Sequence, residues 1–101
     1  MNRFSIFGEL VSVEGKRDEL VDILQDAEKL LLVKNADCQL YSVNISPDKP
    51  NSVFVFEIWT DEASHQNSLR DEGVLALIMR AKPIIQNIQR HYTLTTVSKQ
   101  S

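Results

Sequence analysis

The sequence has little of what several large classes of protein require. It contains one cysteine, Cys38, so no disulfide can form within the chain, and a reducing compartment is the expected setting. Only three glycines are present, Gly8, Gly15 and Gly73, too widely separated for a phosphate-binding loop. Cysteine and histidine also lack the spacing of a metal site. These absences exclude a disulfide framework and argue against phosphate-loop enzymes and zinc proteins.

Positive charge and long apolar runs are scarce as well. The net charge is −3, and the basic residues are scattered along the chain, which argues against a nucleic-acid partner. No segment approaches the ~18–20 uninterrupted apolar residues of a membrane span. The N-terminus shows no small-residue cleavage site, so no signal peptide is predicted. We therefore expect a cytoplasmic protein with no membrane partner.

What is present predicts one globular domain over residues 1–101, ending in a polar tail at 98–101. The chain is 43% hydrophobic and 25% charged, ordinary values for a small domain with one core. The most informative stretch is 52–59, SVFVFEIW, which reads as a strand that is apolar on both sides. Such a strand is usually covered on both faces of its sheet.

The remaining elements follow from periodicity and turn residues. Apolar residues at helical spacing predict helices over 16–35, 61–69 and 74–88, the last ended or kinked near Pro83. Further strands are predicted over 3–13, 37–45 and 91–97, with a turn at 46–51. Gly8 inside the first strand indicates a bulge or a close backbone approach.

This order is β-α-β-β-α-β with the second helical segment broken in two. It is an α+β, ferredoxin-like arrangement: a four-stranded antiparallel sheet with helices on one face. The other face would be bare and apolar, and such a face does not remain in water. We expect a second copy of the chain to cover it, sheet against sheet, in a two-fold homodimer.

Residues 56–69, FEIWTDEASHQNSL, followed by VLALI at 74–78 and AKPII at 81–85, resemble the antibiotic biosynthesis monooxygenase family. The similarity is greatest to its small stand-alone quinol monooxygenases, covers almost the whole chain, and includes the helix entry EGKRDEL at 14–20. It implies a dimeric α/β barrel and oxidation of a small aromatic phenol or hydroquinone by O₂, with no metal, flavin or haem cofactor. The substrate would bind between sheet and helices, and its anion would pass an electron directly to O₂.

Three positions depart from the family's patterns. Val55 stands where some family oxygenases carry an asparagine, and Phe7 and Leu69 stand where the haem-degrading branch has its asparagine and its haem-ligating histidine. Haem degradation is therefore disfavoured. Because Val55 replaces that asparagine, a second hypothesis is favoured: a non-catalytic dimer that binds a small hydrophobic molecule or acts as a regulatory module. A third is an isomerisation or cyclisation that uses His65 for proton transfer.

Two residues are the predicted catalytic groups, on the strength of the family match. The indole N–H of Trp59 can donate to a substrate oxygen, and the imidazole of His65 can act as base or hydrogen-bond donor near neutral pH. The alternatives are a core aromatic whose N–H bonds to backbone and a surface or capping histidine. Ser68, three residues after His65, shares its helix face and is a predicted substrate contact.

The other predicted substrate contacts are strand residues. Glu57 lies in an apolar strand, so its carboxylate must be paired, protonated or at a solvent-exposed end of the strand. The alternative to substrate binding is a structural ion pair with Arg90 or His91. Tyr41 and Asn44 are three residues apart and should point to opposite faces of the sheet. His91 opens the last predicted strand and can reach a cavity. A buried core role is the alternative for Tyr41.

Overall fold

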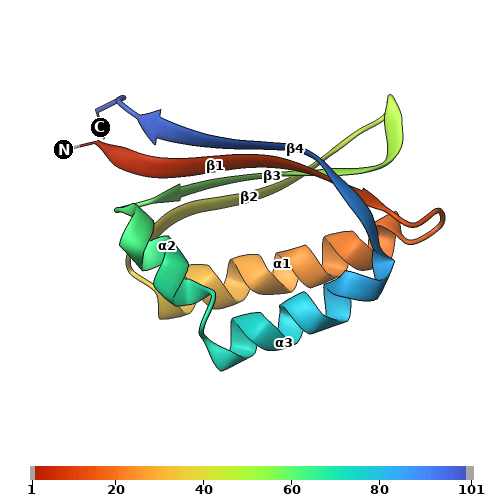
Figure 1. Cartoon of the computed structure of the whole chain (residues 1–101), viewed down its shortest axis with the longest axis horizontal. Helices are drawn as coiled ribbons and strands as arrows, with labels where there is room; N and C mark the ends of the chain where they lie inside the picture. Colours follow the sequence, from red (N-terminus) through yellow and green to blue (C-terminus); the bar gives the residue numbers. More distant parts are fainter. Residues whose placement is uncertain (1, 100–101) are drawn as a thin grey trace.

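The computed structural model describes residues 2–99. Figure 1 shows two layers, a sheet with all helices on one of its faces. The sheet is antiparallel in the order β2-β3-β1-β4. Its strands are β1 (Arg3–Ser12), β2 (Cys38–Ser46), β3 (Lys49–Trp59) and β4 (Ile85–Thr96); the helices are α1 (Arg17–Lys34), α2 (Glu62–Ser68) and α3 (Glu72–Ala81). The predicted ferredoxin-like fold, with its second helical segment in two pieces, is confirmed.

Helix α1 forms where the apolar stripe predicted it. Its buried residues recur at three- and four-residue steps and pack on the sheet: Leu20, Ile23, Ala27 and Leu31. Acidic residues occupy the first turn and Lys34 the last, as the helix dipole favours. Asn35 ends the helix, as expected.

Helices α2 and α3 each begin at an aspartate. The side chain of Asp61 accepts from the backbone N–H of Ser64 at 2.8 Å, and Asp71 accepts from that of Val74 at 3.1 Å. The predicted break at 71–73 is therefore the start of α3, because Asp71 caps it and Glu72 opens its first turn.

The predicted end of the last helix near Pro83 is confirmed, but the assignment of the residues beyond it, to 88, as helical was wrong. Helix α3 ends at Ala81, a short 3₁₀ turn η1 (Lys82–Ile84) contains Pro83, and β4 begins at Ile85. Proline cannot continue the helical hydrogen bonding, and β1 offers residues 85–90 a strand partner. Strand β4 consequently starts six residues before the predicted strand at 91.

The β2–β3 hairpin is tighter than expected. Ser46 pairs with Lys49, so the turn consists of Pro47 and Asp48 alone, and β3 starts at Lys49 rather than at Ser52. The irregularity suspected at Gly8 lies one residue on, where the β1–β4 register shifts between Glu9 and Leu10. The polar tail predicted for 98–101 extends beyond the described residues.

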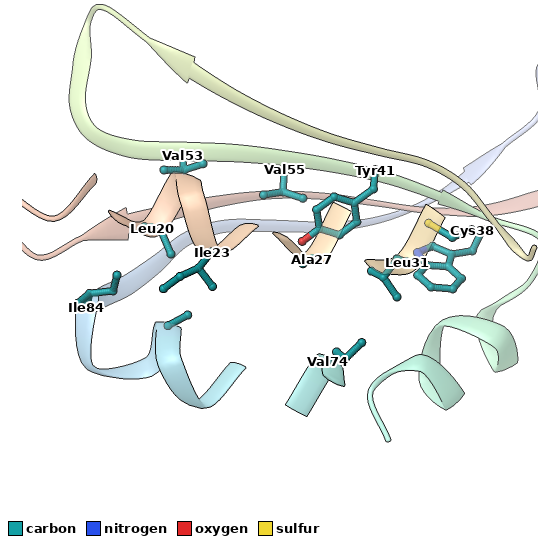
Figure 2. Close-up of a cluster of buried hydrophobic side chains, with 12 residues drawn as sticks. Leu20, Ile23, Ala27, Leu31, Cys38, Tyr41, Val53, Val55, Val74 and Ile84 are labelled. Atoms are coloured by element: carbon teal, nitrogen blue, oxygen red, sulfur yellow. The ribbon is translucent and has the colours of Figure 1, made fainter. Parts of the chain in front are cut away.

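The core lies between the sheet and α1, with α3 closing its far side. Figure 2 shows side chains from β2, β3 and the helices meeting there, with Tyr41 projecting from the sheet into the layer between. Trp59, Leu20 and Val53 are fully buried. No helix within residues 2–99 is long and apolar enough to cross a membrane.

The opposite face of the sheet carries large apolar side chains without any helix over them. Phe7 stacks on Phe54 with ring centroids 6.2 Å apart and on Tyr92 at 6.4 Å. The strand register places further apolar residues on this face, which we call the bare face: Leu40, Phe56, Ile58 and Leu94.

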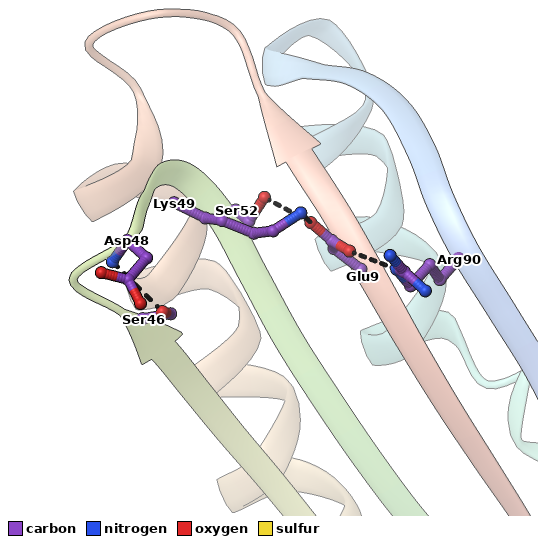
Figure 3. A network of polar contacts seen from close by, with 6 residues as sticks. All are labelled: Glu9, Ser46, Asp48, Lys49, Ser52 and Arg90. Atoms are coloured by element: carbon purple, nitrogen blue, oxygen red, sulfur yellow. Dashed lines mark hydrogen bonds and ion pairs between the residues drawn. The ribbon is translucent and has the colours of Figure 1, made fainter.

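One buried carboxylate interrupts the bare face. Glu9 is 1% exposed and receives three partners: Ser52 Oγ at 2.7 Å, Lys49 Nζ at 3.4 Å and Arg90 Nε at 3.1 Å. Figure 3 shows Glu9 held between Lys49 and Ser52 on one side and Arg90 on the other. Hydrogen bonding from Ser52, opposed by desolvation, lowers the pKa of Glu9. The network keeps a charge within the apolar surface.

Candidate functional site

The candidate site is a cavity between the sheet and the helices. One part, about 200 Å³, lies among α1, α2 and α3, and an adjoining part of about 200 Å³ lies under β1 and β4. Both parts are lined by Leu10, Leu24, Tyr41, Glu57 and His65, so they lie next to each other, and we describe them together as the cavity. Its walls are mostly aliphatic, and a space of this kind suits a small apolar or aromatic molecule.

Tyr41, Glu57 and His65 are the polar side chains common to both parts of the cavity. They come from β2, β3 and α2, and strand alternation explains why Tyr41 and Glu57 face the helices: they are direct partners across the β2–β3 ladder. His91 of β4 lines the second part and Ser68 the first. Five of the seven predicted site residues therefore converge on one cavity.

The Glu57 carboxyl group is held from one side. Its Oε1 accepts the indole N–H of Trp59 at 3.0 Å, and among the described residues no cation pairs with it. Burial raises the pKa of Glu57, and the Trp59 hydrogen bond offsets part of this rise. Arg90, considered as its partner, pairs instead with Glu9 on the other face.

His65 is held by aromatic contacts. Its ring meets Trp59 edge-on, with centroids 5.4 Å apart at 71°, and lies 5.7 Å from Phe4. Its Nδ1 is buried and has no hydrogen-bond partner among residues 2–99. Desolvation, reinforced by His91, lowers the pKa of His65, so the ring is neutral at pH 7.

Tyr41 and Cys38 are the other titratable groups near Glu57. Burial, reinforced by Glu57, raises the pKa of the Tyr41 phenol far above its ordinary value, so this phenol stays protonated. Burial likewise raises the pKa of Cys38 to about 11, which makes it an inert thiol. Tyr41 can therefore donate a hydrogen bond inside the cavity but cannot act as a base at neutral pH.

Trp59 and Ser68 are placed differently from the roles predicted for them. Trp59 is fully buried, does not line the cavity, and directs its N–H to Glu57. Ser68 lines the cavity, but its hydroxyl donates to the backbone carbonyl of His65 at 2.6 Å. Both residues position their neighbours in this arrangement.

Asn44 lies outside the cavity. It faces the bare side of the sheet, where its amide donates to Ser42 Oγ at 2.8 Å and to the Phe54 carbonyl at 3.2 Å. The prediction that Tyr41 and Asn44 face opposite sides is confirmed, and Tyr41 is the one that faces the site.

Three features of the site were not predicted from the sequence. Gly8 lines the cavity without a side chain, Lys82 is the cation on its wall, and Ile88 lines it from a segment predicted to be helical. Alternation with Ile6 and Leu10 was the available signal for Gly8. Residues 2–99 contain no group of three or more His, Cys, Asp or Glu side chains that could hold a metal ion.

Comparison with known proteins identifies the family and the fold of this chain. The sequence model of the antibiotic biosynthesis monooxygenase family matches residues 7–79. The chain belongs to this family. No curated protein matches the sequence.

Solved structures share the fold throughout. A protein from Chloroflexus aurantiacus J-10-fl, provisionally named an antibiotic biosynthesis monooxygenase, superposes with a TM-score of 0.89 at 24% identity, covering 98% of this chain and 97% of its own. A similarly named protein from Bacteroides thetaiotaomicron VPI-5482 gives 0.84 at 13% identity, covering 96% and 90%. A Pseudomonas aeruginosa protein gives 0.82 at 16%, covering 97% of each chain. At these identities the similarity establishes the fold.

Proposed function

We propose that this protein is a cofactor-independent monooxygenase that oxidises a small aromatic phenol or hydroquinone with O₂. The observation that carries the proposal is the cavity itself: an apolar space of single-ring size into which Glu57, His65 and Tyr41 converge. Family membership supports the reaction class. His65 meets a substrate oxygen as base or hydrogen-bond donor.

The reaction balances without an external reductant. A hydroquinone and O₂ give a hydroxyquinone and water, and the substrate supplies all four electrons that O₂ accepts. The first step is formation of the phenolate, the electron-rich species that reduces O₂. The protein lowers the free energy needed to form the phenolate and keeps water from the reacting atoms.

We propose that the bare face is covered by a second copy of the chain in a two-fold homodimer. Phe7, Phe54 and Tyr92 form a continuous aromatic row, and Tyr92 is 49% exposed in the single chain. An apolar face that no other element of the chain covers is typical of an interface.

The single unpaired Cys38 suits a reducing cytoplasm, which we propose as the location.

The test is oxygen uptake by chelator-treated protein over a panel of hydroquinones. The proposal expects uptake above autoxidation, with no oxygen returned when catalase is added, because monooxygenation makes water. Return of half the oxygen would indicate a peroxide-forming oxidase. No uptake with any quinol, together with saturable binding, would favour the non-catalytic binding module.

A further inference from the structure

We infer that Glu57 is the catalytic residue that takes the proton from the substrate hydroxyl, and that the cavity selects a neutral aromatic hydroxyl compound. This inference rests on the proposed function for its reaction, but it can be tested by binding alone. The step is a simple transfer: ArOH and the Glu57 carboxylate become ArO⁻ and the Glu57 carboxylic acid. The O–H bond of the substrate breaks and an O–H bond forms on Glu57, nothing is oxidised or reduced, and the total charge of the pair stays at −1.

The geometry of Glu57 leaves one oxygen for a ligand. Oε1 is occupied by the Trp59 N–H at 3.0 Å, which fixes the plane and direction of the carboxyl group. Oε2 accepts no hydrogen bond from any described residue, and Glu57 lines both parts of the cavity. A hydroxyl group bound in the cavity would supply the missing donor. An anionic ligand would instead face an unpaired carboxylate, so neutral molecules are favoured.

His65 is poorly suited to be the base. Its buried Nδ1 has no acceptor among residues 2–99, so a proton on that atom would be an unsatisfied buried donor. The favoured neutral form therefore carries its proton on Nε2, which is not buried. Accepting a second proton would create the costly Nδ1–H. His65 thus serves as a hydrogen-bond donor through Nε2, and proton removal falls to Glu57.

The groups around Glu57 agree with this division of roles. The titratable groups near Glu57 or on the cavity wall are Cys38 and Tyr41 from β2, His65 from α2, His91 from β4 and Lys82 from η1. The residues of α1 that line the cavity are apolar. Glu28 of α1 contributes through its charge to the raised pKa of Tyr41. Tyr41 and Cys38 hold their protons at neutral pH. Burial raises the pKa of Glu57 toward that of a phenol, which reduces the energy difference the proton must overcome.

The experiment measures turnover of Glu57→Gln and His65→Gln with hydroquinones of graded acidity, from methoxy- to chloro-substituted. Glutamine keeps the acceptor for Trp59 but cannot take a proton, so a loss of about 100-fold or more is expected for Glu57→Gln with weakly acidic substrates. The loss should shrink as the substrate becomes more acidic, since an ionised quinol needs no base. His65→Gln should lose activity equally across the series. A Glu57→Gln rate equal to wild type, or a loss independent of substrate acidity, would overturn the inference.

If the wild type consumes no oxygen, the proposed function fails and binding decides the inference separately. Fluorescence of Trp59, the only tryptophan, reports binding of 4-methoxyphenol and of 1,4-dimethoxybenzene, which has no hydroxyl proton. We expect the wild type to prefer the phenol by about tenfold or more, as for a hydrogen bond to a charged group. Glu57→Leu should lose this preference and still bind the dimethyl ether. An undiminished preference in Glu57→Leu would contradict the inference.

Discussion

The indole N–H of Trp59 donates to Oε1 of Glu57 across 3.0 Å, between residues two apart on the same face of β3. The bond joins a fully buried aromatic to a carboxyl group that lines the cavity. Trp59 therefore acts on the site through Glu57, as a positioning residue. It also contacts the His65 ring edge-on, so one side chain orients both polar groups.

Trp59→Phe should move the acidic limb of the activity profile to higher pH. The Trp59 hydrogen bond lowers the pKa of Glu57, so removing the N–H raises that pKa further and the ionised form appears later as pH increases. The pH dependence of kcat/KM for quinol oxidation measures the change. The same substitution in a Glu57→Gln background is the control and should shift nothing; a shift there would assign the effect to another group.

Glu57→Gln should be more stable than the wild type at pH 7, by about 0.5–2 kcal/mol, as is common when a strained site is relieved. The raised pKa means that the folded state binds more protons than the unfolded state, so stability falls as pH rises through the unfolded value of 4.5. The gain should therefore vanish at pH 4 and below. Urea unfolding at pH 4 and pH 7 checks this. An equal gain at both pH values would contradict a titration effect.

His65 should make the protein less stable in acid. Its pKa is lowered in the fold, so below the ordinary value of 6.5 the unfolded state takes up a proton that the folded state resists. Stability is then lost as pH falls from 6.5 through the folded pKa. His65→Phe keeps the aromatic contact and should flatten this loss in thermal unfolding. His91→Gln removes only the smaller contribution to the lowered pKa of His65, so this variant should retain most of the loss. A loss abolished in His91→Gln and unchanged in His65→Phe would contradict the assignment.

Phe7→Lys should disrupt the proposed homodimer. Phe7 lies in the middle of the aromatic row, between Phe54 and Tyr92, and a charge there would have to be buried against the second copy. Light scattering coupled to size exclusion gives the mass. Met79→Lys, on an exposed position of α3, is the control and should leave the dimer intact. A wild type that runs as a monomer at micromolar concentration would contradict the proposal.

Most of the fold was predictable because local and global signals agree. The apolar stripe predicted α1, and the capping residue Asp61 predicted the start of α2. The run of residues 52–59, apolar on both sides, predicted β3. Residues 85–88 were misassigned because Ile85 and Ile88 also fit helical spacing, and only pairing with β1 makes them a strand. Long-range pairing of this kind leaves no local signal.

The site was partly predictable for a similar reason. A carboxylate inside an apolar strand indicated that Glu57 was special, but its partner was sought among cations and lies two residues away, at Trp59. Asn44 could not be excluded because alternation gives opposite faces without stating which one faces the helices. The family resemblance suggested Trp59, while only the packing showed that it does not reach the cavity.

The most direct test of the central claim is oxygen uptake by Gly8→Val beside Gly8→Ala. A side chain at position 8 would enter the cavity, since its first carbon meets only the Arg90 carbonyl at 3.7 Å, an ordinary contact. If the reaction occurs there, Gly8→Val loses quinol oxidation by about tenfold or more through a raised KM, as for lost substrate fit, while Gly8→Ala retains most of it. Wild-type uptake by a folded Gly8→Val protein would place the chemistry elsewhere and contradict the account.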